Sequence, residues 1–260
     1  MADPDGENRA LWDAWADEHQ AMWNAATDDG GLPPVYSPLP DPGSLDDWQA
    51  ERLPAFEDLD FVELGCGGGQ GTVGAADEGI GTAVGVDFST QQLRHATRLR
   101  NLYGVDAEFV VGDVSDLPLA DDAFDLAYSG FVYFMVEDLD AALGEARRVL
   151  REDGVLSFEV PHPFHELFDP DTLEFERSYH ATGPRRDKND EVLHEDIVVF
   201  DRTIGELHTA LVEAGFEVKQ LWEWPQSDDP DDYDDEGAKS TSPELKAKVP
   251  RTLGFRAVVD

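Results

Sequence analysis

One stretch constrains the fold of this chain more than any other: residues 60–74, which read DFVELGCGGGQGTVG. The apolar run at 61–64 predicts a buried strand, and the glycines after it predict a tight turn leading into a helix. Gly65, Gly67, Gly68 and Gly69 carry no side-chain bulk, so backbone N–H groups can approach a ligand where the helix begins. This order of strand, turn and helix predicts the first unit of a nucleotide-type binding site.

After residue 60 the hydrophobic pattern alternates between short apolar runs and amphipathic segments. This alternation predicts a largely parallel, doubly wound α/β sheet. Ser89 is expected to cap one helix, Thr203 with Glu206 forms a capping box at another, and Gly154 is expected as a left-handed cap. The expected strands are 60–64, 82–86, 108–111, 124–128, 155–160, 216–224 and 252–259, and the expected helices are 71–78, 89–102, 139–150 and 203–214.

Two segments depart from this rhythm and predict the domain organisation. Residues 1–44 form an N-terminal helical cap or lid, and residues 45–260 form the main domain, with an insertion at about 161–200. An amphipathic helix is expected over 8–27, and a further helix over 45–56. In the insertion, 173–179 and 192–200 are expected to pair as antiparallel strands around a polar loop at 183–190. Trp12, Trp15, His19 and Trp23 share one face of the first helix, which fits core packing, a ligand lid or both.

Composition places this chain among soluble proteins. Its 260 residues are 41% apolar, which allows a sizeable core, and no stretch reaches the ~18 apolar residues of a membrane span. No signal peptide is visible, so a cytoplasmic location is expected. The single cysteine, Cys66, excludes an intramolecular disulfide and a cysteine-rich zinc site.

The charge is strongly acidic, with 57 Asp and Glu against 19 Lys and Arg and a formal net charge of -38. Acid is spread over the whole chain, so an acidic surface is expected rather than an acidic tail that binds a basic partner. This composition resembles that of salt-adapted proteins from halophiles, in which salt screens the self-repulsion. Long-range attraction of nucleic acid is therefore not expected.

Carboxylates follow the expected strands at the places where a ligand would need them. Asp87 comes directly after the second strand, where a carboxylate can accept hydrogen bonds from ribose hydroxyls. Asp113 follows the third strand, where it can accept from an exocyclic amine. A dinucleotide fingerprint would need glycine at position 70, which is Gln70, and no lysine or arginine lies between 60 and 81 to clamp a phosphate.

At this point the chain resembles the class I S-adenosylmethionine-dependent methyltransferases, particularly the small-molecule branch called type 11. The resemblance covers about residues 60–160, and more weakly 203–224 and 250–259. It rests on the motifs VELGCGGG, GVDFS, VVGDVSDLPLADDAFDLAYS and EARRVLREDGVLSF. It implies a Rossmann-like, seven-stranded sheet in the order 3-2-1-4-5-7-6 with strand 7 antiparallel.

The resemblance also implies S-adenosyl-L-methionine as the cofactor and a role for each matching residue. Glu63, Gly65, Cys66, Gly67 and Gly69 would surround the methionine moiety, although Cys66 also reads as a small residue packed in the turn. The ribose and adenine contacts would come from Asp87, Phe88, Asp113 and Val114, and the wall near the transferable methyl from Ser129 and Gly130.

Methyl transfer from a sulfonium needs positioning above all, and a general base only when the acceptor arrives protonated. Tyr133, His162 and His165 are candidate bases, although packing roles suit each of them. The acceptor, a small molecule methylated at O, N or C, would be bound by residues 8–43 and 161–200. Arg185, Arg186 and Lys188 form the densest basic cluster there, which fits a solvated loop tip or a site for an anion.

Other functions remain open on the sequence alone. The glycine turn with Asp87 also fits an NAD-dependent reductase, although Gln70 and the absence of a Tyr-x-x-x-Lys pair weaken that interpretation. A non-catalytic ligand-binding or assembly protein could use the same fold. The seven histidines show no ligand spacing with acidic partners, so no metal is expected. The oligomeric state is not specified by any pattern.

Overall fold

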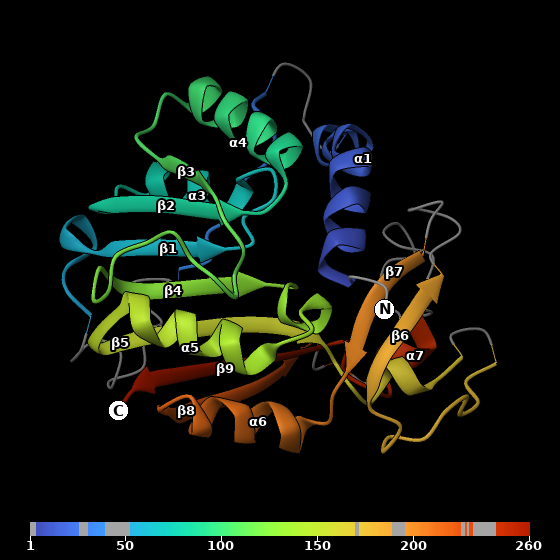
Figure 1. The fold of residues 1–260 in the computed structure, drawn as a ribbon. Helices are drawn as coiled ribbons and strands as arrows, with labels where there is room; N and C mark the ends of the chain where they lie inside the picture. The colour runs from blue at the N-terminus through green and yellow to red at the C-terminus, as the bar shows by residue number, and fades with distance from the viewer. Residues whose placement is uncertain are drawn as a thin grey trace.

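Seven strands form the central sheet, in the order β3-β2-β1-β4-β5-β9-β8 (Figure 1). The computed structural model describes residues 4–25, 31–39, 53–169, 172–188, 196–224, 227, 229–230 and 243–260. Neighbouring strands are parallel except around β9, which runs antiparallel to both β5 and β8. The expected sheet order and antiparallel last strand are confirmed. The strands are β1 Asp60–Leu64, β2 Thr82–Asp87, β3 Glu108–Val111, β4 Phe124–Gly130, β5 Leu150–Pro161, β8 Phe216–Trp224 and β9 Thr252–Val259.

Helices cover both faces of this sheet because successive strand residues point to opposite faces. On β1, Phe61 packs in a cluster with Ala75 of α3, whereas Val62 and Leu64 pack in a larger cluster with residues of α5 and α6. The α-helices that flank the sheet are α3 Gln70–Asp77, α4 Thr90–Tyr103, α5 Leu139–Val149 and α6 Ile204–Glu213, and the shorter helices are η1 Phe56–Asp58, η2 Tyr133–Met135, η3 His165–Leu167 and α7 Pro243–Lys246.

Helix capping follows the sequence at two of the three expected places. The Ser89 side chain accepts a hydrogen bond from the N–H of Gln92, and Thr203 with Glu206 forms a complete capping box. The expected left-handed cap at Gly154 is wrong. Helix α5 ends at Val149 and leads directly into β5, and the left-handed residue there is Asp153, with φ of 64°. A short polar side chain tolerates this conformation better than most others.

The N-terminal helix α1 (Pro4–Ala25) packs against α4 and β7, and Figure 1 shows it beside the carboxyl ends of the central strands. Asn8 fixes its start, because its side chain exchanges hydrogen bonds with the backbone of Val198 at 2.9 and 3.0 Å. The helix expected over 45–56 lies mostly outside the described residues.

A second sheet of two strands lies next to α1, formed by β6 (Gly183–Lys188) and β7 (Asp196–Asp201). The expected partner of the second strand, 173–179, is therefore wrong, since β7 pairs with the stretch expected to be a polar loop. The alternation of side chains between the two faces of β6 explains this outcome. Arg185 bonds Asp201 within the second sheet, and Arg186, the next residue along β6, reaches Glu7 of α1. Of the expected strand 192–200, residues 192–195 lie outside the described part.

Candidate functional site

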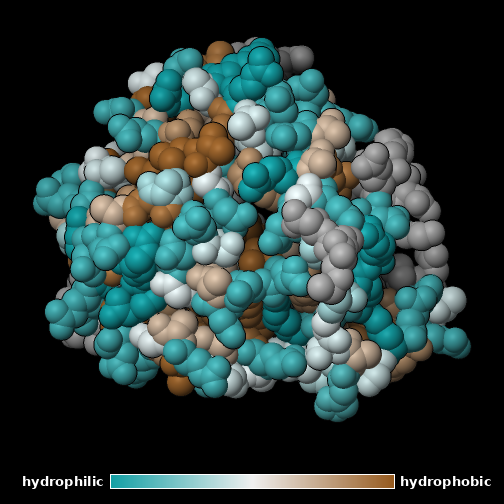
Figure 2. Space-filling model, viewed as in Figure 1, coloured by the Kyte–Doolittle hydropathy of each residue, from teal (hydrophilic) through white to brown (hydrophobic). Residues whose placement is uncertain are grey.

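A cavity of about 440 Å³ lies at the carboxyl ends of β1, β2 and β4, where ligands bind in open α/β sheets. Figure 2 shows that this face of the molecule is hollowed near its centre, with hydrophobic side chains at the bottom of the hollow. The expected site residues that line the cavity are Gly65, Cys66, Gly67, Asp87, Phe88, Asp113, Val114 and Gly130.

The glycine turn is held tightly against the end of β2. The N–H groups of Gly65 and Cys66 both donate to the carbonyl oxygen of Val86, at 2.8 and 2.9 Å. Gly65 has φ of 78°, and a Cβ built on it would lie 2.3 Å from a methyl carbon of Val132. Both the left-handed backbone and the close approach therefore require glycine at this position.

Asp87 joins this turn to the start of α4. One carboxylate oxygen accepts from the N–H of Gly67 and the other from the N–H of Ser89, both at 2.8 Å. Burial raises the pKa of Asp87 to about 6. Each oxygen keeps a further lone pair, so the carboxylate can still accept hydrogen bonds from hydroxyls of a ligand in the cavity.

The far end of the cavity is built from Phe88, Asp113 and Val114. One oxygen of Asp113 accepts from the N–H and the hydroxyl of Ser115, at 3.0 and 2.7 Å. The other lies 3.5 Å from the guanidinium of Arg9, which also lies over the ring of Phe88, 5.5 Å from its centroid. Arg9 of α1 thus covers this end of the cavity.

Three expected site residues support the turn and do not line the cavity. Gly69, with φ of 81°, caps α3, and a Cβ there would meet Ala96 at 2.7 Å. The hydroxyl of Ser129 donates to the carbonyl of Leu64 at 3.0 Å and ties β4 to β1. Glu63 is 1% exposed and lies behind the turn.

Glu63 is a fully buried carboxyl beneath the glycine turn. It accepts from the hydroxyls of Thr72 at 2.6 Å and Tyr36 at 3.0 Å. Burial raises its pKa to about 7, and the two hydroxyl donors act in the opposite direction. A Cβ at Gly71 would lie 2.4 Å from one carboxyl oxygen, so the start of α3 packs directly on this group.

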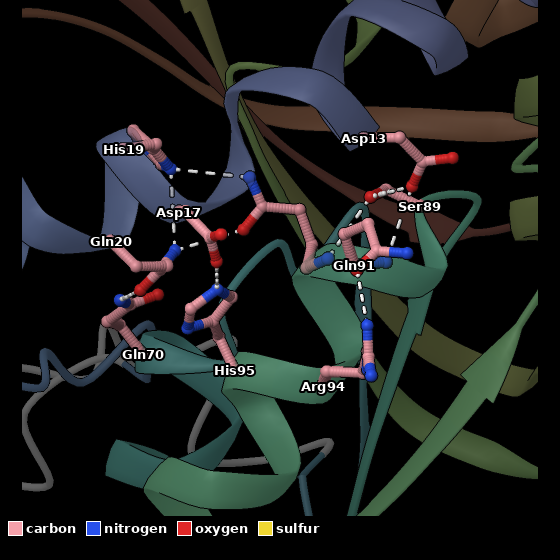
Figure 3. A network of polar contacts seen from close by, with 10 residues as sticks. Asp13, Asp17, His19, Gln20, Gln70, Ser89, Gln91, Arg94 and His95 are labelled. Atoms are coloured by element: carbon pink, nitrogen blue, oxygen red, sulfur yellow. Dashed lines mark hydrogen bonds and ion pairs between the residues drawn. The ribbon is translucent and has the colours of Figure 1, made fainter.

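A polar network fastens α1 to α4 and to the start of α3 (Figure 3). The Gln20 amide donates to Gln92 at 3.0 Å and accepts from Gln70 at 2.6 Å. Further along α1, Asp13 accepts from the hydroxyl of Ser89 at 2.7 Å. The side-chain amide of Gln20 also lies against the glycine turn, because a Cβ built on Gly68 would lie 2.1 Å from the amide nitrogen.

The face of α1 that is turned to the cavity brings Asn8, Trp12, His19 and Trp23 to its wall. Burial lowers the pKa of His19 to about 4, so this ring is neutral at pH 7. The sequence predicts that Trp12, His19 and Trp23 share one helix face, in core packing, a ligand lid or both, and it does not predict that they line the same cavity as the glycine turn. The spacing of the aromatic residues is visible in the sequence. The position of α1 across the strand ends is a matter of topology, which the sequence pattern does not indicate.

A second cavity, of about 660 Å³, lies between α1, the second sheet and the segment after β5. It shares two wall residues, Trp12 and Phe131, with the first cavity. Phe131 directly follows β4 and has φ of 56°, which is strained for an aromatic residue. Its N–H donates to the carbonyl of Glu159 at 2.8 Å, which holds this backbone in place. Phe131 thus stands between the two cavities.

The three candidate bases lie in different surroundings. Tyr133 is fully buried against Phe158, lines neither cavity, and has a pKa raised by burial. His162 accepts from the N–H of Phe164 at 3.1 Å and contacts Glu223 at 2.9 Å, and it also lines neither cavity. His165 is 3% exposed and lines the second cavity.

The expected basic cluster is largely neutralised by acids. Arg185 pairs with Asp201 at 2.8 Å and with Asp187 at 2.9 Å, and Arg186 pairs with Glu7 at 2.6 Å. The Lys188 side chain lies outside the described part of the chain. Among the described residues, no group of three or more His, Cys, Asp or Glu could hold a metal ion. The described helices also include none long and apolar enough to cross a bilayer.

Comparisons with known proteins agree with this geometry. Residues 62–158 match the methyltransferase domain family. A malonyl-[acyl-carrier protein] O-methyltransferase of Methylovorus sp. is 31% identical over 66% of this chain and 56% of its own length. A demethylmenaquinone methyltransferase of Roseiflexus sp. is 40% identical over 34% of this chain and 36% of its own length. The chain thus spans about half the length of such curated relatives or less.

Among solved structures, an S-adenosylmethionine-dependent methyltransferase from Mesorhizobium loti is similar along most of the chain. The two superpose with a TM-score of 0.64 and 27% identity, over 80% of this chain and 94% of that one.

Proposed function

We propose that this chain is a class I S-adenosylmethionine-dependent methyltransferase, and that it transfers a methyl group to a small organic molecule bound in the second cavity. The first cavity is called the cofactor cavity below, and the second the acceptor cavity. The observation that carries the proposal is their adjacency, since Trp12 and Phe131 belong to both walls.

The chemistry of the cofactor cavity fits a cofactor that carries positive charge and no phosphate. Its lining holds the carboxyl groups of Asp5, Asp87, Asp113 and Glu159 and, among the described residues, no lysine or arginine, although Arg9 lies behind Asp113 at one end. The glycine turn leaves the backbone open at Gly67, where no atom lies within 4 Å of a Cβ position. A volume of about 440 Å³ is within the usual range for small-molecule sites.

In this proposal each wall residue binds or orients a part of the cofactor. Asp87 accepts from the ribose hydroxyls, Asp113 from the adenine amine, and Phe88 and Val114 pack on the ring. Gly65, Cys66, Gly67 and Gly130 surround the methionine end, while Glu63, Gly69 and Ser129 hold the turn in shape. When bound, S-adenosylmethionine supplies a methyl group already activated by its sulfonium.

The remaining task of the protein is to align the acceptor and exclude water, which can contribute roughly 7–11 kcal/mol to a reaction of this kind. Residues 4–25 form a lid over both cavities, and described residues within 161–169, 172–187 and 196–202 build the far wall of the acceptor cavity. We assign no general base, because Tyr133 and His162 line neither cavity. His165 remains the candidate on the acceptor wall.

Two named relatives act on a malonyl-[acyl-carrier protein] and on demethylmenaquinone, so neither defines the acceptor here. The strongly acidic chain, with a net charge of -38, supports a small-molecule acceptor over a nucleic acid.

Calorimetric titration with S-adenosylhomocysteine tests the cofactor assignment. It should bind with micromolar affinity, whereas NAD should not bind. Asp87→Asn should weaken binding at least about tenfold, because hydrogen bonds to a charged acceptor contribute about 1.5–3 kcal/mol each. Affinity should also fall as the pH drops below about 6, since a protonated Asp87 loses acceptor capacity.

Asp106→Asn is the matched control, because Asp106 is exposed and lies outside both cavities. Equal binding by wild type and Asp87→Asn would contradict the ribose assignment, and tight binding of NAD would contradict the proposed cofactor.

A further inference from the structure

The wall of the acceptor cavity is neutral in a chain that is otherwise strongly acidic. The whole sequence has 57 acidic and 19 basic side chains, a ratio of three to one. The described wall carries four of each, namely Glu166, Glu176, Asp187 and Asp201 against Arg177, Arg185, Arg202 and Arg251. Cations are therefore concentrated on this surface relative to the rest of the molecule.

Two of these arginines are occupied by acids. Arg177 and Arg185 both pair with Asp201, and Arg185 also pairs with Asp187 at 2.9 Å and lies 3.8 Å from Glu166. Their charges hold β6, β7 and the segment after β5 together. They have little capacity left for a ligand.

Arg202 is already engaged by its own surroundings. Its guanidinium donates to the carbonyls of Tyr133 at 2.9 Å, Val136 at 2.6 Å and Glu137 at 3.0 Å. Burial lowers its pKa, and the nearby carboxylates of Glu206, Asp140 and Asp138 act in the opposite direction. Arg251 differs, because it is exposed directly before β9 and its side chain makes no hydrogen bond or ion pair with the other described residues.

Further polar groups on the same wall also lack partners. The indole nitrogens of Trp12 and Trp15 and the Nε2 atom of His165 are buried without a hydrogen bond in the described structure. An indole N–H can only donate, as can a guanidinium. The buried polar atoms left without partners on this wall are therefore mainly donors, and acceptor oxygens of a bound molecule would complement them, whereas the exposed Glu176 carboxylate can stay in solvent.

Arg251 lies on the part of the wall that the cofactor cavity does not share. Trp12 and Phe131 line both cavities, whereas Arg251 lines only the acceptor cavity of these two. A group bound at Arg251 is thus placed away from the junction, and another atom of the same molecule would lie at the junction.

We propose that the acceptor is a small organic anion with an apolar body, whose anionic group is bound by Arg251 while a different atom receives the methyl group. This inference rests on the proposed function, because it takes the acceptor cavity as the place where the substrate binds. The anionic group serves to bind the acceptor and takes no part in the methyl transfer.

Calorimetry with matched probe pairs tests the proposal on the full chain saturated with S-adenosylhomocysteine. The probes are 4-phenylbutanoate and octanoate, each compared with its own carboxamide. Each carboxylate should bind at least about tenfold more tightly than its amide, which is the usual size of a hydrogen bond to a charged group. Arg251→Gln should remove most of this preference and leave amide binding unchanged. Added salt should reduce it as well, because Arg251 is exposed.

Arg98→Gln is the control, since Arg98 is an exposed arginine of α4 outside both cavities. Equal binding of acid and amide, no binding of either, or an unchanged preference in Arg251→Gln would each overturn the proposal. The titration with S-adenosylhomocysteine separates the two hypotheses. If it binds and the carboxylates do not, only the acceptor class is wrong; if it fails to bind, the proposed function itself is wrong.

Discussion

The cofactor cavity and the acceptor cavity lie side by side but are built in different ways. Carboxyl ends of parallel strands and the turns after them form most of the first, so its key groups are fixed by the sheet. The second is enclosed by α1, the segment after β5 and the small β6–β7 sheet, which come from distant parts of the chain. Ion pairs such as Arg185–Asp201 hold it together.

This difference has a consequence for how each half tolerates change. In the cofactor half, the backbone of the glycine turn lies close to neighbouring side chains. A single Cβ would clash there, as at Gly65 with Val132. The acceptor half is shaped by side chains, which can be replaced without altering the sheet. We therefore expect substitutions in the cofactor half to affect stability and cofactor binding together, and those in the acceptor half to change binding of the acceptor alone.

Gly65→Ala should have the largest effect. The left-handed backbone costs about 1–2 kcal/mol with a Cβ, and the contact at 2.3 Å from Val132 adds roughly 1–3 kcal/mol. Urea unfolding should show a loss of about 3 kcal/mol, and S-adenosylhomocysteine binding should weaken more than about tenfold.

The control for this variant is Gly144→Ala. Gly144 lies inside α5, where no atom is within 4 Å of a Cβ position, so alanine should raise stability by up to about 1 kcal/mol. If Gly65→Ala unfolded at the wild-type urea concentration, the close packing of the turn against Val132 would be contradicted.

Glu63→Gln should have an intermediate effect that depends on pH. The folded-state pKa of about 7 lies above the ordinary value of 4.5, so the folded protein binds more protons between these values. The contribution of this carboxyl to stability is therefore present below about pH 4.5, falls as the pH rises, and is lost above about pH 7. Glutamine at position 63 does not ionise, so the variant does not lose stability through this group as the pH rises. Unfolding experiments should find the variant's relative stability higher at pH 8 than at pH 5, by roughly 2–3 kcal/mol.

Glu57→Gln, at an exposed carboxyl, serves as the surface control for this measurement. A difference between Glu63→Gln and wild type that stays constant from pH 5 to pH 8 would contradict a buried, protonatable Glu63.

The same contrast explains what the sequence could predict. Local signals specify the cofactor half: the glycine turn, Asp87 at the end of β2, Asp113 after β3 and the cap at Ser89 all lie near the strand ends that their patterns indicate. The sheet order followed from the resemblance and is confirmed. The donors Gly67 and Ser89 lie within 20 residues of Asp87 in sequence, and the pairing of neighbouring strands β1 and β2 brings this part of the site together.

The acceptor half depends on contacts that no local pattern encodes. Asn8 of α1 reaches Val198 of β7, and Arg186 of β6 reaches Glu7 of α1, both across long separations in sequence. The sequence does not predict the pairing of β6 with β7, because charged residues that look like a loop are neutralised by acids from other segments, Asp201 of β7 and Glu7 of α1. Phe131 carried no sequence signal, since its strain follows from the backbone after β4.

Phe131→Gly should have the smallest effect on stability and the sharpest effect on the boundary between the two cavities. Glycine adopts φ of 56° without strain, so the relief should offset the lost ring contacts to within about 1 kcal/mol. S-adenosylhomocysteine should bind within about threefold of wild type, whereas 4-phenylbutanoate should bind at least about tenfold more weakly, because the shared wall is removed. Asp122→Gly, at an exposed left-handed residue with φ of 49°, gives the effect of strain relief alone and should leave both ligands unaffected. If Phe131→Gly weakened both ligands equally, the two cavities would function as one site.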